Sequence, residues 1–196
     1  MIRYKHLDDS FLYDGSQIDS NWAFKELRIK GSSVITWIGG MNIDPSNLKD
    51  FEDVGLEISA SSMAHFIVEL FDVQPANLLV AYLRQRILVS ILNEELLSRG
   101  IPSSRKGDDI YIGSSKLTVS IASASLSSMK IHFGINLTHE GTPDDVDAIG
   151  LYQLLDVNGD KVFNSSNILD FISKVANKFI DELNTIVLDI SKTNLL

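Results

Sequence analysis

Lys116 is the residue of this chain whose type and position most directly indicate a site for an anionic ligand. It follows Asp109 by seven positions across a Gly-Ser-Ser turn, so a hairpin would bring the ammonium close to the carboxylate. A lysine ammonium is a compact charge that binds carboxylates and phosphates. Arg105 and Lys106 precede the same hairpin and could complete the site, although solvation alone also explains charged residues in a loop. We predict an anion contact at Lys116 that an ion pair with Asp109 could orient, although a purely structural ion pair, or a solvated lysine at the start of a strand, also fits the pattern.

The strands around this hairpin place further polar residues. Side chains alternate between the two faces of a strand, so the apolar residues at positions 117, 119, 121, 131, 133, 135 and 137 are expected to face the core. The opposite face is then polar, and it collects Lys116, Thr118, Ser120, His132, Gly134, Asn136, Asp109, Tyr111, His65 and Glu69. Gly134 would leave a gap for close approach of a ligand or another backbone. A sheet with one polar face and no function is equally consistent with the pattern.

Other candidates lie earlier in the chain. His65 and Glu69 share a strand face and could exchange a proton, although a histidine on a half-buried strand is more often structural. Asp14 and Gln17 lie in a turn before a helix, where such residues act as caps. The functional alternative is that this turn and Trp22 form the wall of a pocket.

Composition excludes several classes of function. A formal net charge of −9 repels nucleic acid, and the absence of cysteine excludes disulfides, thiolate metal sites and cysteine nucleophiles. Residues 156–160 resemble a calcium loop, but Lys161 and Asn167 stand where an EF-hand needs Gly and Glu, so we predict no metal. No apolar run approaches the roughly 20 residues that span a bilayer. We expect a cytoplasmic protein without a nucleic-acid or membrane partner.

Periodicity predicts the elements that position these residues. We expect helices over 20–27, 75–99 and 168–188, and strands over 34–38, 64–71, 110–112, 117–122 and 130–136, with a loop from 41 to about 62. Pro75 and Gly100 bound the second helix, and one apolar face runs along the third. The chain is long enough for its own core. We predict a single α+β domain over residues 1–196, with a mostly antiparallel sheet packed by helices.

The hairpin resembles the catalytic core of biotin and lipoate protein ligases. In biotin protein ligases a Lys-Trp-Pro-Asn-Asp segment leads into a strand, and a lysine seven positions after its last aspartate contacts the acyl carboxyl and the adenylate. Here Arg105-Lys-Gly-Asp-Asp109 takes that place, Lys116-Leu-Thr-Val follows, and the family's Gly-Ile-Asn matches Gly134-Ile-Asn136. The resemblance covers roughly residues 83 to 137. It implies the ligase fold and an acyl or adenylate pocket around Lys116.

The whole chain is more closely similar to an uncharacterised family, domain of unknown function 366, which resembles the same ligases. The similarity rests on Tyr13-Asp-Gly-Ser-Gln17, Trp22, Met63-Ala-His-Phe-Ile-Val-Glu69, Arg84-Gln-Arg86, Gly107-Asp-Asp109 and Lys116-Leu-Thr-Val-Ser-Ile-Ala122. This resemblance implies the fold and assigns no activity.

Two departures from the ligases bear on the chemistry. Ligases hold phosphates with a loop rich in Gly and Arg, whereas residues 42–62 here contain five acids, Asp44, Asp50, Glu52, Asp53 and Glu57, and only Lys49 as a base. Two like charges ~4 Å apart repel by roughly 4 kcal/mol near a protein surface, so ATP-dependent adenylation is disfavoured. Acyl transfer through a cysteine is also excluded.

Two functions from different classes follow. The first is a protein that binds a small acyl, carboxylate or nucleotide-like ligand, acting as an acyltransferase or ligase if it is catalytic, with Lys116 at the centre of the site. The sequence identifies no cofactor. The second is a non-catalytic interaction module that forms a homodimer through a sheet edge or its helices.

Overall fold

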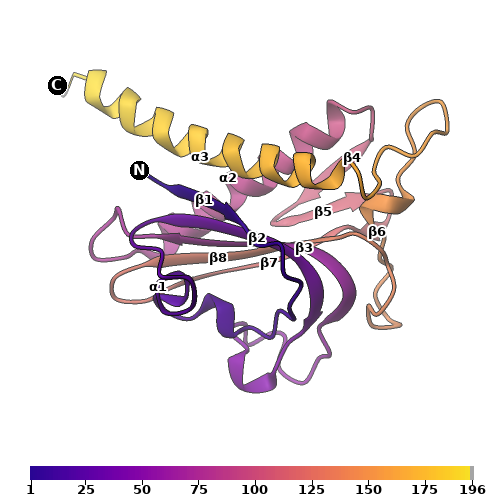
Figure 1. Cartoon of the computed structure of the whole chain (residues 1–196), viewed down its shortest axis with the longest axis horizontal. Helices are drawn as coiled ribbons and strands as arrows, with labels where there is room; N and C mark the ends of the chain where they lie inside the picture. Colours follow the sequence, from indigo (N-terminus) through magenta and orange to yellow (C-terminus); the bar gives the residue numbers. More distant parts are fainter. Residues whose placement is uncertain (195–196) are drawn as a thin grey trace.

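A five-stranded sheet forms the centre of the molecule in the computed structural model, which describes residues 1–194 (Figure 1). Its strands lie in the order β1-β2-β3-β8-β7. Their bounds are Arg3–His6 for β1, Ser33–Asn42 for β2, Ser59–Leu70 for β3, Thr118–Ala124 for β7 and Met129–Asn136 for β8. Only β1 and β2 pair in parallel, and the other three pairings are antiparallel. The prediction of a mostly antiparallel α+β fold is confirmed.

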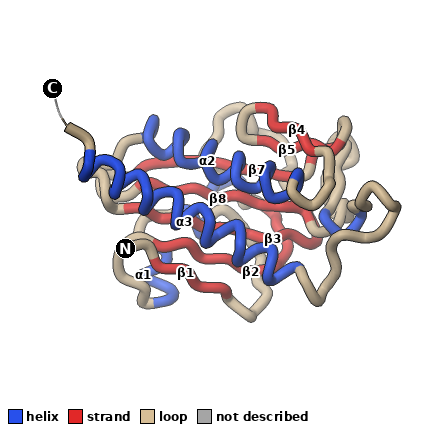
Figure 2. Tube along the Cα trace, turned by 90° about the horizontal axis from the view of Figure 1, so that it is seen from above, coloured by secondary structure: helices blue, strands red, loops and turns tan. Residues whose placement is uncertain are grey.

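Two long helices cover one face of this sheet. Helix α2 spans Leu78–Leu97 and helix α3 spans Ile168–Lys192, and both lie above the strands when the sheet is viewed from the helix side (Figure 2). The main hydrophobic core lies between them and the sheet, where Phe66, Phe133 and Phe179 are completely buried. Glu95 of α2 joins the helices by accepting ion pairs from Lys174 and Lys178 of α3.

The opposite face of the sheet is also covered. The segment around Tyr13 and the short helix α1, Trp22–Leu27, pack there and enclose a second, smaller core that contains Trp37, Met63 and Ile67. Because both faces are covered, every residue of β8 is buried. The predicted polar face is therefore an interior layer of the molecule.

A second sheet of three short strands carries the Lys116 hairpin. Its strands are β4, Ser103–Lys106, β5, Asp109–Ile112, and β6, Ser115–Lys116. Leu117 separates β6 from β7, and its amide donates to the Ile110 carbonyl oxygen, so the chain passes directly from the small sheet into the central one. The hairpin thereby holds Lys116 beside the end of β8.

Two predictions about these strands were wrong. Thr118 pairs with Ile135, and Val119 pairs with Gly134, so Val119 lies on the His132 side of the sheet while Thr118 faces helix α2. The alternation of apolar residues predicts the reverse, because it treats these residues as marking a single core face. That rule fails where both faces of a sheet are buried.

The predicted elements differ from the observed ones mainly at their ends. Helix α1 begins at Trp22 instead of residue 20, α2 begins three residues after Pro75, and α3 continues to Lys192. Strands β2 and β3 extend into the region predicted as a loop, and β1, β4 and β6 were not predicted. Within residues 1–194, no helix is both long enough and apolar enough to cross a membrane.

Candidate functional site

An open groove of about 890 Å³ runs beside the Lys116 hairpin, and we refer to it as the Lys116 groove. One wall is the acidic segment 50–59, the floor is formed by the ends of β7 and β8, and the other wall is the loop 141–148. Among the sequence-predicted site residues, Lys116, Asp109 and Asn136 line it. The structure thus brings the ligase-like lysine, its carboxylate and the asparagine of the Gly-Ile-Asn tripeptide to one place.

Lys116 and Asp109 form the predicted ion pair, with 3.0 Å between Nζ and Oδ2. The lysine side chain is 30% exposed, so it can still contact a ligand in the groove. The Lys116 carbonyl oxygen accepts from the Ile149 amide and, at 3.5 Å, from Asn136 Nδ2. These backbone contacts fix the position of the lysine between the hairpin and β8.

Carboxylates surround the lysine, and their protonation is perturbed. Burial raises the pKa of Asp109 above its ordinary value, and the neighbouring Lys116 only partly offsets this effect. The pKa of Asp53 is also raised, first by burial and then by repulsion from Asp50, with Lys116 again opposing the shift. The groove therefore disfavours additional negative charge, as the acidic loop had indicated.

Asp108 is held differently from its neighbour. Burial acts to raise its pKa, but hydrogen bonds from Arg86 and Ser120 outweigh burial and keep the pKa below its ordinary value. Arg86 Nη1 lies 2.7 Å from Asp108 Oδ1, and Gln85 Nε2 donates to Asp108 Oδ2 at 3.1 Å. Helix α2 thus anchors the start of the hairpin, and Asp108 remains ionised.

A smaller cavity of about 70 Å³ adjoins the groove, and we refer to it as the Tyr13 cavity. Its walls include Tyr13, Ile18, Ile121 and His132, and it shares the lining residues Met41, Asp50, Asp53, Ile58, Val119 and Ser120 with the Lys116 groove. The two spaces are therefore adjacent. The Tyr13 cavity is lined by aromatic and aliphatic side chains and also by Asn47, Lys49, Asp50 and Asp53.

His132 lines this cavity and is hydrogen-bonded to His65, which does not line it. The ring of Tyr13 stacks on His132 with 3.6 Å between centroids, and Trp37 stacks on His65. His65 Nδ1 lies 3.1 Å from His132 Nε2. His65 and Glu69 do not pair with each other, which agrees with the structural role that the sequence favoured for this histidine, because each residue has another partner.

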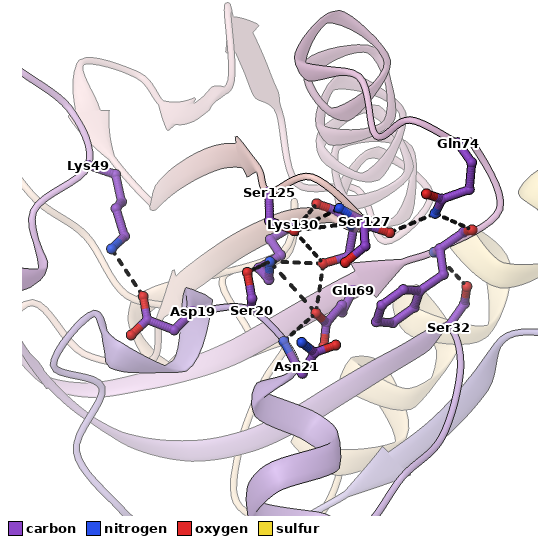
Figure 3. Close-up of polar contacts among 12 residues, drawn as sticks. Asp19, Ser20, Asn21, Ser32, Lys49, Glu69, Gln74, Ser125, Ser127 and Lys130 are labelled. Carbon is purple, nitrogen blue, oxygen red and sulfur yellow. Dashed lines mark hydrogen bonds and ion pairs between the residues drawn. The ribbon is translucent and has the colours of Figure 1, made fainter.

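Glu69 is paired instead with Lys130, which the sequence had shown only as the start of a strand. Both side chains are 2% exposed, and Lys130 Nζ lies 3.7 Å from Glu69 Oε1 (Figure 3). The same oxygen accepts from the Asn21 amide at 2.8 Å and from the Ser128 hydroxyl at 2.9 Å. Lys130 also donates to the Ser20 and Ser128 hydroxyls. Burial lowers the pKa of Lys130, and Glu69 opposes that shift.

Gly134 does not open a space for a ligand. A Cβ atom at this position would lie 2.8 Å from Met63 Cε and 3.2 Å from Val119 Cγ2. The missing side chain therefore makes room for those two neighbours within the smaller core.

The remaining predicted residues lie outside the groove. Arg105 and Lys106 are exposed on β4 and line neither space, and Arg105 Nη1 donates to the Gly107 carbonyl oxygen. The Thr118 hydroxyl accepts from the Ile110 amide below the hairpin. These three residues support or flank the hairpin.

Asp14 and Gln17 stabilise a turn, but neither caps a helix, since the 3-10 helix Ser16–Ile18 has Gly15 at its N-cap and no side-chain cap hydrogen bond. Asp14 Oδ1 accepts from the Ser16 amide, and Gln17 Oε1 accepts from the Asp14 amide. Trp22 packs against Phe11 and Trp37 on the outer side of this segment. The turn contributes its neighbours Tyr13 and Ile18 to the cavity wall.

Tyr13, His132 and Lys130 were missed as functional candidates or weighed too lightly. Lys130 and His132 are two positions apart on one strand, so their side chains lie on the same face, and this spacing could have placed them in one group of candidates. The stacking of Tyr13 depends on how the segment 7–21 folds across the sheet, and no local pattern encodes that path. In residues 1–194 no three histidine or acidic side chains are grouped so that they could hold a metal ion.

Comparison with known proteins gives one family and two levels of structural likeness. The family described as "Domain of unknown function (DUF366)" matches residues 2–194. The uncharacterized protein MJ0805 of Methanocaldococcus jannaschii is 36% identical over 191 residues, which cover 94% of this chain and 81% of that protein. A solved protein of unknown function from Pyrococcus horikoshi has a TM-score of 0.87 at 34% identity, with all of both chains covered.

More distant solved structures share the fold. A biotin protein ligase from Aquifex aeolicus in complex with biotin and ATP has a TM-score of 0.58 at 17% identity, covering 92% of this chain and 71% of that one. Protein Ta0514 from T. acidophilum with bound lipoic acid has a TM-score of 0.54 at 10% identity, covering 91% of this chain and 86% of that one. The predicted biotin and lipoate ligase-like fold is confirmed.

Proposed function

The chain belongs to the DUF366 family, and from this premise we propose that it binds a small carboxylate or acyl ligand in the Lys116 groove. One observation carries the proposal. The Lys116 ammonium is partly exposed, is fixed through its backbone beside β8, and lines the groove that adjoins the Tyr13 cavity. An ammonium in a groove that adjoins a largely apolar recess fits an acid with an apolar body.

The charges of the groove restrict the ligand. Aspartates and glutamates at positions 50, 52, 53, 57, 108, 109, 144 and 145 line it, and Lys116 is the one basic residue among the described lining residues. A triphosphate would meet repulsion from several of these acids, whereas a single carboxylate could replace part of the contact between Lys116 and Asp109. We therefore favour a ligand with one negative charge.

Two ligands of structurally similar proteins fit this restriction. The Aquifex aeolicus ligase was solved with biotin and ATP, and protein Ta0514 with lipoic acid. Biotin and lipoic acid each join one carboxyl group to an apolar chain, whereas the ATP of the Aquifex aeolicus ligase carries the triphosphate that the acidic groove here disfavours. If the ligand reacts, transfer of its acyl group is the reaction class that we favour. Adenylation by ATP conflicts with the acidic groove, and a thioester on the protein would need a cysteine that the chain lacks. We also propose a cytoplasmic location, which cell fractionation would test.

Thermal shift measurements would test ligand binding. We would compare biotin, lipoate, octanoate and ATP, and we expect the melting temperature to rise with at least one of the three carboxylates and to stay unchanged with ATP. A ligand at 100 times its Kd stabilises the folded state by about 2.7 kcal/mol. The Lys116→Ala variant should lose most of the shift, whereas Lys106→Ala on the same small sheet should keep it. An unchanged shift in Lys116→Ala would contradict a lysine-centred site.

A second candidate function rests on exposed apolar residues at one end of the molecule. Helix α2 begins and helix α3 ends at the same end (Figure 2), and Leu79, Leu83, Val187 and Ile190 there are between 56% and 69% exposed. Two copies that pair these helices would cover the apolar surface, which fits a homodimeric interaction module. Sedimentation of the wild type and of Val187→Glu would decide, since a monomeric wild type rejects the dimer.

A further inference from the structure

The buried histidines form a hydrogen-bonded chain whose direction can be determined. His65 Nε2 lies 3.2 Å from the Gly39 carbonyl oxygen, and because a carbonyl oxygen only accepts, this nitrogen carries the proton. In a neutral imidazole the other nitrogen is then an acceptor. His65 Nδ1 therefore accepts from His132 Nε2, which lies 3.1 Å away.

Both rings are neutral in this arrangement. His65 is completely buried and His132 is 2% exposed, and aromatic rings stack on both. Burial lowers the pKa of His65 to about 4, and burial together with the nearby His65 lowers the pKa of His132 well below its ordinary value. A second proton on His65 would place its Nδ1–H donor against the N–H donor of His132. A second proton on His132 would leave its Nδ1–H donor among apolar side chains.

The hydrogen-bonded series of the two histidines ends at a nitrogen lone pair at the Tyr13 cavity. With its proton on Nε2, a neutral His132 carries an unprotonated Nδ1, and within residues 1–194 no donor is hydrogen-bonded to it. The Tyr13 hydroxyl in the same wall likewise has no hydrogen-bond partner in that part of the chain. Neither atom is among the buried polar atoms that lack a partner in residues 1–194, so both are accessible from the cavity, and an accessible acceptor at a cavity wall can accept from a donor on whatever fills the cavity.

We propose that the Tyr13 cavity receives an uncharged hydrogen-bond donor, a hydroxyl or amide N–H, at the far end of the ligand, and that His132 Nδ1 accepts from it. This inference rests on the proposed function, because it takes the carboxylate end to lie at Lys116. Asn136 contacts the Lys116 backbone and lies four residues along β8 from His132. Four residues of a strand span on the order of 13 Å, so the ligand class is an acid of about that length with a neutral donor at its end.

Two probes that differ in one hydroxyl test this assignment. Octanoate and its ω-hydroxy derivative both carry the carboxylate, and only the second carries the terminal donor. We expect the hydroxy acid to bind about tenfold more tightly by calorimetry, which corresponds to about 1.4 kcal/mol. In His132→Phe, which keeps a ring beneath Tyr13, the two Kd values should become equal. In the control Ile121→Val, which changes an apolar wall residue, the tenfold ratio should persist.

A measurement on the wild type keeps the test valid if His132→Phe does not fold. Nitrogen-15 resonances of the histidines should show His132 protonated at Nε2 and bare at Nδ1, and the hydroxy acid should shift the Nδ1 resonance while octanoate does not. Protonation at Nδ1, or equal binding of the two acids to the wild type, would overturn the inference and leave ligand binding at Lys116 intact.

The carboxylate-free probe octan-1-ol separates the two proposals. If octanol shifts the Nδ1 resonance while neither acid binds, the donor site in the cavity stands and the Lys116 contact fails. If no probe shifts that resonance, the cavity assignment is rejected.

Discussion

Removing the buried charge of Lys130 should destabilise the protein far more than removing an exposed lysine. In Lys130→Met, Glu69 would stay buried as an unpaired charge, although the Asn21 amide and the Ser128 hydroxyl would still donate to it. Breaking a buried ion pair by removing one partner costs about 3–5 kcal/mol. For a domain of this size that corresponds to a fall in Tm of roughly 6–20 °C.

Urea unfolding and calorimetry would measure this loss, and two variants provide controls. Lys49→Met removes an exposed lysine 3.1 Å from Asp19, in the same region of the molecule (Figure 3), and should cost less than about 1 kcal/mol. Adding Glu69→Gln to Lys130→Met removes the stranded charge but keeps an oxygen for both donors. It should recover at least half of the lost stability.

Two results would refute this reasoning. A loss below about 1 kcal/mol in Lys130→Met would show that Glu69 finds solvent or protonates at little cost. Failure of Glu69→Gln to restore stability would show that the lysine acts through packing of its methylene groups instead of through its charge.

Three further predictions concern stability. Glu95 is ionised at neutral pH, because hydrogen bonds from Lys178, Arg99 and Lys174 outweigh burial and hold its pKa at about 2. The stability that these contacts add should be present above the ordinary pKa and lost as the pH falls from about 4.5 toward 2. Glu95→Gln should flatten this part of a stability–pH curve measured by calorimetry. Gly134→Ala should cost about 1–3 kcal/mol in urea unfolding because its Cβ would lie against Met63 Cε and Val119, and no loss would show that these side chains move freely. The predicted single domain over residues 1–196 requires that fluorescence and far-ultraviolet circular dichroism give one coincident unfolding curve, and separate transitions would contradict it.

The parts of the fold that local patterns encode were predictable. Helix α3 has one continuous apolar face, and Pro75 and Gly100 flank helix α2, so both helices could be placed from the sequence. The ion pair between Asp109 and Lys116 followed from the spacing of a hairpin. These features depend on residues that are close together in the chain.

Features that depend on distant segments were not predictable in this way. The segment around Tyr13 covers the second face of the sheet, and this cover reversed the meaning of the alternation at Thr118 and Val119. The same cover buries the polar side chains on that face, which therefore pair with each other. His132 is hydrogen-bonded to His65, and Lys130 is paired with Glu69. A strand pattern shows which residues share a face but not what lies against it.

Calorimetric titration of octanoate into the wild type, Lys116→Gln and Lys106→Gln tests the central claim most directly. Lys106 is an exposed lysine on β4 of the same small sheet and lies outside the groove, so the two variants lose the same charge at different places. Our account predicts a Kd at least about tenfold weaker in Lys116→Gln, a loss of about 1.4 kcal/mol, and an unchanged Kd in Lys106→Gln. Equal binding by all three proteins, or no binding by the wild type, would contradict it.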